Sequence, residues 1–329
     1  MNSKTTQQTQ WWLRLLTLVA ALLAIVFFIL TPWNIVPIPS HPKPAQSYRE
    51  AVQLIEQLRQ QEQQAMNPLC TLELMTHNKT TERAIILVHG YTSCPRQFHE
   101  LGKRLYAEGY NVLIAPLPHH GLANRMTSEH GRLKAEELAR YADATVDIAQ
   151  GLGDKVFMIG LSAGGVTTAW AAQHRHDLNG AVIIAPAFGF KKIPAPLTGA
   201  AMNLYGLAPD SFTWWDPTKR EKAKPLYGYP AYSHHALTEI LRLGFTIRAD
   251  AQCDAAAAQK VIVVLNAFDD AVNNESAYSM INVWRQHNTK VRVIEFPAQV
   301  KLPHDMIDPS KPEQQTELVY PFLIKLLNN

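Results

Sequence analysis

Hydrophobic and polar positions along the chain divide it into three regions with different patterns. Residues 11–30 are apolar apart from Arg14 and Thr17, and about 20 such residues in a helix span the hydrocarbon of a bilayer. Residues 31–44 are dense in proline, which predicts a semi-rigid extended spacer. From residue 69 onward, short apolar runs alternate with longer helical patterns. The chain is therefore expected to combine an apolar helix, a spacer and one large α/β domain.

The apolar helix is expected to be an uncleaved membrane anchor. Trp11, Trp12 and Trp33 bracket it as interfacial residues do, and Arg14 is near enough to its start to reach the headgroups. A cleaved signal peptide is one alternative, but no small-x-small cleavage site follows the run. A buried core helix is another, but the run lacks polar caps and an amphipathic stripe. The distribution of basic residues favours a cytoplasmic segment at residues 1–10 and places the rest of the chain on the periplasmic side of a bacterial inner membrane.

Residues 48–66 predict a membrane-proximal helix that packs on the domain. Their apolar side chains recur at helical spacing, Ser47 is a plausible N-cap, and Glu50 stands at the capping-box position. A membrane-surface helix is the weaker alternative, because the polar face has few basic residues. The spacer and this helix together make up the expected segment 31–68, which precedes the domain at residues 69–329.

The domain is predicted to contain a mostly parallel sheet flanked by helices. The expected strands are residues 69–76, 84–88, 111–115, 155–159, 181–184, 261–265 and 291–296, and the expected helices include residues 98–108, 127–150 and 166–172. Apolar runs of this length, separated by helices, are typical of parallel sheets covered on both faces. Residues 187–250 interrupt the alternation and are rich in Pro, Gly, Tyr and Trp, so they are expected to form an inserted cap.

A candidate nucleophile follows the fourth of these strands. The sequence GLSAG at 160–164 has the form G-x-S-x-G and stands between the strand and an apolar helix. Its two glycines permit a sharp strand-to-helix turn that projects Ser162 above the sheet, at a helix N-terminus that favours negative charge. The alternative is a glycine-rich turn in which the serine only caps the helix.

A second motif, LVHGYTS at 87–93, ends the strand over residues 84–88. With both motifs in this order, the chain from about residue 69 to the C-terminus resembles the α/β-hydrolase superfamily. The resemblance is to its carboxylesterase and monoglyceride-lipase-like branch, often labelled serine aminopeptidase-like. It implies the α/β-hydrolase fold and an oxyanion hole made by the backbone amides of Tyr91 and Ala163. The alternative for His89-Gly90 is a simple turn at the end of a strand.

The chain order of that fold places an acid and then a histidine after the serine. Strand 261–265 runs into NAFDDAV, and the related enzymes carry Val or Ile three residues after the acid, so Val272 favours Asp269 over Asp270. Asn266 stands where the family usually has glycine. His304 is singled out because it is the one histidine after the last strand. Its neutral imidazole is expected to take the serine proton, while Asp269 fixes its tautomer.

The pocket around this triad is expected to include His89, His120, Trp214 and Trp215. His119 and His120 are the runner-up pair for the catalytic histidine. Their Pro-His-His-Gly sequence resembles a Gly-His-Gly loop near the active site of these families, so both are interpreted as pocket-rim residues. A zinc site is the minor alternative, but no further His or Cys has metal-ligand spacing. No metal or cofactor is expected. The cap aromatics fit either an acyl pocket or the cap's own core.

The three cysteines offer a possible disulfide. If the first two strands of the domain form a hairpin with Thr76 opposite Ala84, Cys70 comes near Cys94. A Cys70–Cys94 bridge would suit an oxidising compartment outside the cytoplasm. The alternative is a pair of buried free thiols, and Cys253 has no obvious partner.

Composition narrows the class of function. The net charge is +3 and the basic residues are scattered, so a nucleic-acid partner is not expected. The leading hypothesis is a serine hydrolase that cleaves short- or medium-chain carboxylic esters or monoacylglycerol-like lipids. The alternatives are an aminopeptidase with the same triad and a non-catalytic envelope protein that uses the fold to bind ligands.

Overall fold

Seven strands form one central sheet in this computed structural model, which describes residues 3–61, 65–223 and 225–328. They are β1 (Glu73–Met75), β2 (Thr81–Val88), β3 (Asn111–Ile114), β4 (Gly153–Leu161), β5 (Gly180–Ile184), β8 (Val261–Asn266) and β9 (Val291–Phe296). Their order across the sheet is β1-β3-β2-β4-β5-β8-β9, and every neighbouring pair is parallel except β1 with β3. β3, β5 and β8 are buried throughout, as expected for parallel strands covered on both faces. The predicted mostly parallel sheet is confirmed.

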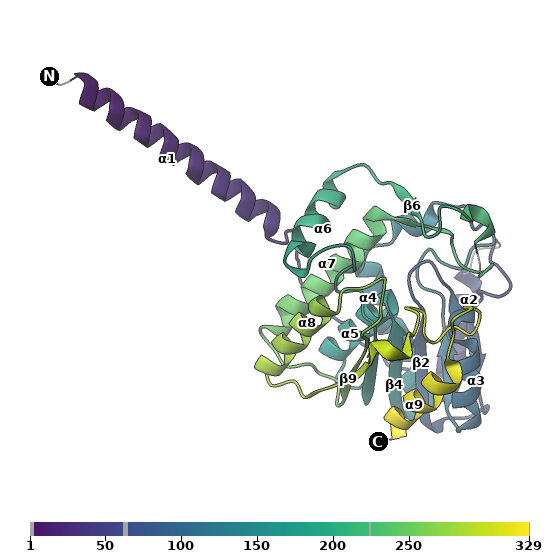
Figure 1. Cartoon of the computed structure of the whole chain (residues 1–329). Coiled ribbons are helices and arrows are strands. Elements are labelled where there is room, and N and C mark those ends of the chain that lie inside the picture. Colours follow the sequence, from purple (N-terminus) through teal and green to yellow (C-terminus); the bar gives the residue numbers. More distant parts are fainter. Residues whose placement is uncertain (1–2, 62–64, 224, 329) are drawn as a thin grey trace.

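Helices cover both faces of this sheet (Figure 1). They are α2 (Tyr48–Gln61), α3 (His99–Ala107), α4 (Ala135–Leu152), α5 (Ala163–His174), α7 (His234–Ala251), α8 (Asn274–Gln286) and α9 (Thr316–Asn328). α4 and α5 pack against β2, β4 and β5, and α2 packs on the outside of α4. On the other face α3 lies beside α9, where the Arg104 guanidinium is 5.1 Å from the centre of the Tyr320 ring.

β1 departs from the expected strand over residues 69–76 in both length and pairing. It spans only Glu73–Met75 and pairs with β3, with Met75 opposite Val112, so the expected hairpin with β2 is wrong. The reason is that both edges of β2 are occupied by parallel neighbours, β3 and β4. The side chain of Asn111 also accepts from the backbone N–H of His77 at 2.8 Å, which holds the chain after β1 beside β3.

Two of the expected helices have different ends in the structure. The helix expected over residues 127–150 begins only at Ala135, because the Glu137 carboxylate accepts from the Lys134 backbone N–H at 2.9 Å and caps the helix there. The helix expected over residues 48–66 is α2, which ends at Gln61. Residues 62–64 lie outside the described part of the chain. α2 packs its apolar side on the domain, with Ile55 fully buried, so the membrane-surface alternative is wrong.

α1 (Ser3–Leu30) extends away from the domain (Figure 1). Within the described residues, Gln10–Leu30 is the one helical stretch long and apolar enough to cross a membrane, judged by length and composition. None of this stretch is buried, so the interpretation as a core helix is wrong. A signal sequence near an N-terminus has the same length and composition. Residues 1 and 2 of the expected cytoplasmic segment lie outside the described residues.

The proline-rich segment over residues 31–44 is extended but packs on the domain, with Ile38 buried. Its backbone N–H groups donate to Asp143 at 2.7 Å and to Asp147 at 2.9 Å. Both carboxylates also bind the guanidinium of Arg175, which is 0% exposed. A buried charge needs such partners, and this network holds the segment against α4.

The chain between β5 and β8 contains the insertion expected at residues 187–250. Besides α7 it contains α6 (Thr198–Leu207) and a two-stranded antiparallel ribbon, β6 (Phe212–Trp214) with β7 (Ala231–Ser233). Figure 1 shows α6 and β6 above the sheet, with α6 beside the end of α1. The insertion thus lies between the end of α1 and the carboxyl ends of the strands.

Candidate active site

Ser162 occupies the tight turn between β4 and α5, with φ 60° and ψ −113°. A non-glycine residue rarely adopts this region, and such strain is found at functional sites. The flanking glycines make the turn possible. A Cβ on Gly160 would be 2.0 Å from the Gly164 carbonyl oxygen, and one on Gly164 would be 2.2 Å from the Val88 carbonyl oxygen. The G-x-S-x-G pattern therefore reflects close contact between the turn, the helix and β2.

Asp269 and His304 lie on the loops after β8 and β9 and are joined by a hydrogen bond. His304 Nδ1 is 2.8 Å from Asp269 Oδ2, so the imidazole donates through Nδ1 and its Nε2 is left for another partner. The other oxygen of Asp269 accepts from the backbone N–H groups of Ala271 and Val272, each at 2.9 Å. Asp269 is 2% exposed, whereas Asp270 is exposed. Of the two adjacent aspartates, the structure pairs Asp269 with the histidine.

Asn266 explains how the two loops keep this geometry although the family's usual glycine is absent. Its side-chain amide donates to the Leu302 carbonyl at 2.9 Å, which ties the end of β8 to the loop that carries His304. Its carbonyl oxygen accepts from the backbone N–H of Phe268 at 3.1 Å. Asn266 is fully buried, so these bonds also satisfy polar groups that would otherwise be costly to bury.

The pKa values of the pair shift in opposite directions. Burial lowers the pKa of His304, but the charge and hydrogen bond of Asp269, together with the charges of Asp305 and Asp270, outweigh burial, and the net shift is upward. Burial raises the pKa of Asp269, but His304 and the amides of Ala271 and Val272 outweigh it, and the net shift is downward. The environment therefore favours the ionised carboxylate and makes the imidazole a stronger base than usual.

A cavity of about 670 Å³ opens above these residues, between the sheet and the insertion. Ser162 and His304 line its floor together with Gly90, Tyr91 and Ala163. Aromatic side chains from the insertion line its walls, namely Phe190, Tyr205, Trp214, Trp215, Tyr229 and Tyr232. Four other aromatics of the insertion lie elsewhere. Phe188 and Phe245 line a second cavity, the Tyr227 hydroxyl donates to Asp308, and the Phe212 ring packs edge-on against His130. Some aromatics of the insertion thus line the cavity, and others pack within the insertion and against the domain.

His89 and His120, like His119, are absent from the lining of this cavity, so the expectation that they belong to the pocket is wrong. Each is buried and accepts a backbone N–H through Nε2: His89 from Leu117 at 2.9 Å, and His120 from Thr92 at 3.1 Å. Burial lowers the pKa of His89 to about 4 and that of His120 well below its ordinary value. Both are therefore neutral imidazoles that connect the loop after β2 to the loop after β3.

Gln97 and Asp305 support the site and were missed by the sequence analysis. The Gln97 carbonyl oxygen accepts from the Gly90 backbone N–H at 2.9 Å, and its amide donates to Asp305 at 3.1 Å. Asp305 also forms an ion pair with Lys311 at 2.5 Å. These contacts join the loop of Tyr91 to the loop of His304. No spacing rule identifies Gln97, because its partner Asp305 is 208 residues away in the sequence.

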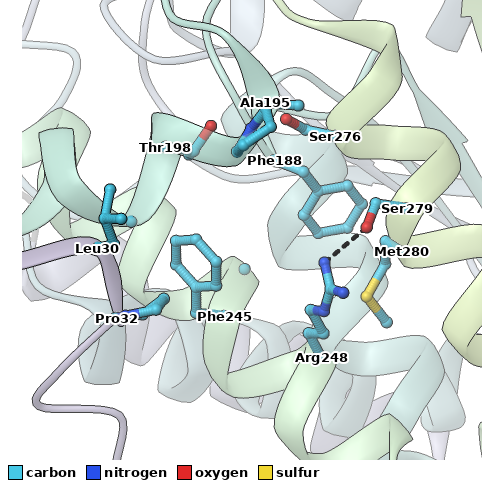
Figure 2. A pocket seen from close by; sticks show the side chains of 13 residues that line it. Leu30, Pro32, Phe188, Ala195, Thr198, Phe245, Arg248, Ser276, Ser279 and Met280 are labelled. Carbon is cyan, nitrogen blue, oxygen red and sulfur yellow. Dashed lines mark hydrogen bonds between the residues drawn. The ribbon is translucent and has the colours of Figure 1, made fainter. Parts of the chain in front are cut away.

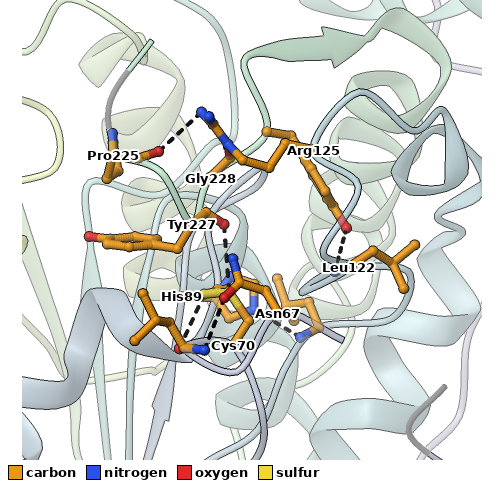
Figure 3. The surroundings of a disulfide bond; sticks show 12 residues. Asn67, Cys70, His89, Leu122, Arg125, Pro225, Tyr227 and Gly228 are labelled. Carbon is orange, nitrogen blue, oxygen red and sulfur yellow. Dashed lines mark hydrogen bonds between the residues drawn. A yellow bond between two sulfur atoms is a disulfide. The ribbon is translucent and has the colours of Figure 1, made fainter. Parts of the chain in front are cut away.

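Cys70 and Cys94 form a disulfide, with their Cα atoms 5.3 Å apart (Figure 3). The strand pairing assumed in the expectation is wrong, and a different contact brings the cysteines together. The segment before β1 runs beside the loop after β3, where the Asn67 N–H donates to the Gly121 carbonyl at 2.8 Å. On the other side, the Tyr229 N–H donates to the Thr92 carbonyl at 2.7 Å. The disulfide thus fixes the loop that carries Tyr91.

Metal binding has no support in the part of the chain that the structure describes. No group of three or more His, Cys, Asp or Glu side chains there is arranged to hold a metal ion. His119, which the zinc alternative would use, instead contacts the carboxylate of Glu137 at 3.1 Å.

Comparisons with known proteins agree with this geometry. The model of the family described as serine aminopeptidase, S33, matches residues 79–295. A thermostable monoacylglycerol lipase of Bacillus sp. (strain H-257) is 29% identical over 121 residues, which cover 35% of this chain and 45% of the relative. The match therefore spans less than half of the relative's length.

Solved structures extend the similarity to most of the chain. The Paleococcus ferrophilus monoacylglycerol lipase is 18% identical, with a TM-score of 0.58 over 78% of this chain and 97% of that one. A soluble variant of the Saccharomyces cerevisiae monoglyceride lipase is 14% identical, with a TM-score of 0.58 over 78% of this chain and 90% of that one. At these identities the similarity shows the fold, which is the α/β-hydrolase fold.

Proposed function

The chain belongs to the serine aminopeptidase S33 family of α/β-hydrolases, and on this premise we propose that it is a serine hydrolase of carboxylic esters. Its substrates would be short- or medium-chain acyl esters or monoacylglycerol-like lipids. The single observation that carries the proposal is the site itself. A serine in a strained strand-to-helix turn and a histidine hydrogen-bonded to a buried aspartate line one cavity.

The proposed reaction has two acyl-transfer steps. Ser162 Oγ attacks the ester carbonyl carbon while its proton passes to Nε2 of His304. The C–O bond to the alcohol then breaks, the proton moves from His304 to the leaving alcohol, and the acyl group stays on Ser162. Water repeats the sequence, giving its proton to His304 and releasing the carboxylic acid. Asp269 stabilises the imidazolium in both steps and holds the ring in the tautomer that leaves Nε2 free.

The negative charge that develops on the carbonyl oxygen would be stabilised by the backbone amides of Tyr91 and Ala163. Both residues line the cavity beside Ser162, and Ala163 is the first residue of α5, where the helix dipole favours an anion. Preorganised donors of this kind contribute about 3–4 kcal/mol each to barrier lowering. The hydrogen bond from the Gly90 N–H to Gln97 positions the loop that carries Tyr91.

The aromatic walls support an ester with an apolar acyl chain. A cavity of about 670 Å³ lined by Trp214, Trp215 and further aromatics has the size and polarity of a small-molecule site. The relative from Bacillus, a monoacylglycerol lipase, matches this chain locally and supports the same substrate class.

An aminopeptidase with this triad would need a free carboxylate to hold the substrate amine. The insertion's own acids are Asp210, Asp216 and Glu221, and none of the three lines the cavity. Of the acids that do, Asp305 is paired with Lys311, and Asp308 accepts a hydrogen bond from Tyr227 at 2.6 Å. Asp270 is exposed at the rim and is the acid of this lining left to hold a substrate amine. The preference for an ester therefore rests on the aromatic walls.

A fluorophosphonate probe and a substrate panel test the proposal. The wild-type chain should label, and the Ser162→Ala variant should not label while keeping its fold by circular dichroism. Hydrolysis of p-nitrophenyl esters by Ser162→Ala should fall to within about 10³–10⁴-fold of the uncatalysed rate. A wild-type chain that does not label would favour the non-catalytic binding protein. Faster cleavage of aminoacyl-anilides than of esters would favour the aminopeptidase.

We also propose the placement of the chain in the cell. Residues 11–30 would be an uncleaved single-pass anchor, residues 1–10 would be cytoplasmic, and the domain at residues 69–329, with its cap at 187–250, would lie in the periplasm. The apolar helix supports the anchor. The Cys70–Cys94 disulfide supports an oxidising compartment.

A further inference from the structure

A second cavity of about 330 Å³ lies where α1 meets the domain (Figure 2). Its lining includes apolar side chains from the end of α1 and from the domain, namely Leu30, Pro32, Phe188, Phe245 and Met280. It is separate from the catalytic cavity, because Ser162 and His304 line only the larger one. The proposed reaction does not use it.

The position of this cavity relative to the end of α1 is fixed by α6. The Asn203 amide donates to the carbonyls of Ile29 and Thr31, each at 2.8 Å. A Cβ on Gly199 would be 2.8 Å from Pro32, so the two segments touch through a glycine. If α1 spans the bilayer, its last turn lies where hydrocarbon gives way to headgroups, and the cavity opens at that depth.

One cation faces the cavity without a carboxylate partner. Arg248 Nη1 donates to Ser279 Oγ at 2.6 Å (Figure 2). Among the described residues, no Asp or Glu forms an ion pair with Arg248. A guanidinium beside apolar walls favours a phosphate, which it can bind with two parallel hydrogen bonds.

Two buried hydroxyl groups add to the polar lining. Thr198 is 2% exposed and Ser276 is 9% exposed. Neither Thr198 Oγ1 nor Ser276 Oγ has a hydrogen-bond partner in the structure, although both residues line the cavity. Unsatisfied buried hydroxyls are costly. The two oxygen atoms are themselves covered, so the headgroup of a ligand in the cavity would satisfy them once their side chains rotate toward it.

We propose that this cavity binds the headgroup of an anionic phospholipid from the membrane that holds α1. Arg248 and Ser279 would bind the phosphate, and the hydroxyls of Thr198 and Ser276 would bind the polar end of the headgroup. The volume suits a headgroup rather than a whole lipid. The acyl chains therefore stay in the bilayer beside α1. A bound lipid would fix the domain's orientation on the membrane surface.

The inference rests on the proposed membrane placement of α1 and not on the catalytic proposal. Full-length chain is reconstituted in nanodiscs of four parts phosphatidylcholine to one part phosphatidylglycerol, and the lipids retained after gentle release are counted by native mass spectrometry. Wild-type chain should retain phosphatidylglycerol in preference to phosphatidylcholine. In the Arg248→Gln variant the ratio of retained phosphatidylglycerol to phosphatidylcholine should be about tenfold lower, because the variant lacks a charge-assisted contact to the phosphate.

Two further variants make the result specific. Arg292→Gln removes an exposed cation from β9 and should retain the lipid as wild type does. Ala195→Trp fills the cavity without changing charge and should lose the lipid as Arg248→Gln does. Thermal unfolding in phosphatidylcholine alone checks that each variant is folded.

Three results would overturn the inference. Equal retention of the two lipids by wild type would remove the anionic preference. If Arg292→Gln lost as much phosphatidylglycerol as Arg248→Gln does, the preference would come from the general surface charge and not from this cavity. If glycerol 3-phosphate raised the thermal unfolding temperature of the wild-type chain in detergent, and no phospholipid were retained, the ligand would be a free phosphate ester. None of these results would affect labelling of Ser162, so the catalytic proposal is tested separately.

Discussion

Asp269 and Asp270 are neighbours in the chain but have different surroundings. Asp269 is buried and accepts from His304 and from two backbone amides, whereas Asp270 is exposed at the rim of the cavity. Asp269→Asn is expected to lower kcat by about 10⁴-fold. An asparagine no longer holds the imidazole in the tautomer that leaves Nε2 free, and it carries no charge to stabilise the imidazolium. Asp270→Asn should change kcat little. Steady-state hydrolysis of a p-nitrophenyl ester measures both, and the reverse ranking would make Asp270 the acid.

The raised pKa of His304 predicts how activity depends on pH. The neutral imidazole is the base, so kcat/KM should fall as pH drops through the pKa of the folded enzyme. Because the neighbouring carboxylates, Asp269 foremost, together outweigh burial, that midpoint should lie above the ordinary value of 6.5. In Asp269→Asn the largest raising charge is gone, while burial and the smaller effects of Asp305 and Asp270 remain, so the midpoint should move down. A wild-type kcat/KM that is flat from about pH 5 to pH 8 would contradict a histidine base.

The role of a residue could be predicted where it depends on the residues next to it in the sequence. The prediction failed where the role depends on a hydrogen-bond partner far along the chain. Ser162 is recognisable from glycines two positions away on each side, which the close packing of its turn requires. His89 has a motif too, but its function depends on the Leu117 N–H, 28 residues later. A histidine in an active-site motif thus proved to be a buried structural acceptor.

At the scale of elements, the parallel strands were predictable because burial on both faces makes them continuous apolar runs. β5, for example, is buried throughout and spans Gly180–Ile184, against the expected residues 181–184. The neighbours of a strand were not predictable from such runs. β1 was expected beside β2 because the two are adjacent in sequence, yet it pairs with β3 at the edge of the sheet. Pairing is decided by which edge is left free, and no local pattern encodes that.

The disulfide connects two elements and predicts a redox effect on both stability and activity. Cys70 and Cys94 enclose a separation of 24 residues, so the Cys70→Ala/Cys94→Ala variant should lose about 3 kcal/mol of unfolding free energy. Its activity should fall as well, because the bridge holds the loop that carries Tyr91. Denaturant unfolding and ester hydrolysis measure the two effects. Cys253→Ala is the matched control, since Cys253 is free and exposed, and it should leave both unchanged.

At the scale of the whole molecule, α6 connects the end of α1 to the larger cavity. Asn203 holds the end of α1, while Ala201 and Tyr205 of the same helix line the cavity above Ser162. The domain is therefore not suspended on a free linker, since residues 31–44 are also bound to α4. If α1 spans a bilayer as proposed, a lipid substrate there would meet this cavity close to the end of α1.

This arrangement predicts that the full-length chain behaves as an integral membrane protein with its domain outside the cytoplasm. It should remain in the membrane fraction after high-salt and alkaline washes, because an inserted helix is not held by charge. A chain lacking residues 1–30 is the control and should be released. Protease added to intact spheroplasts should digest the domain, because no membrane protects it there.

Thiol labelling of the denatured full-length chain gives an independent measure of the compartment. One cysteine, Cys253, should react before reduction and all three after it, since Cys70 and Cys94 are bridged. Cytoplasmic reductants would keep all three thiols free, so the count reports where the domain folded. Three reactive thiols together with protection from protease would place the active site in the cytoplasm. A mature chain that begins after residue 30 would instead identify α1 as a cleaved signal sequence, and the site would then act without an anchor.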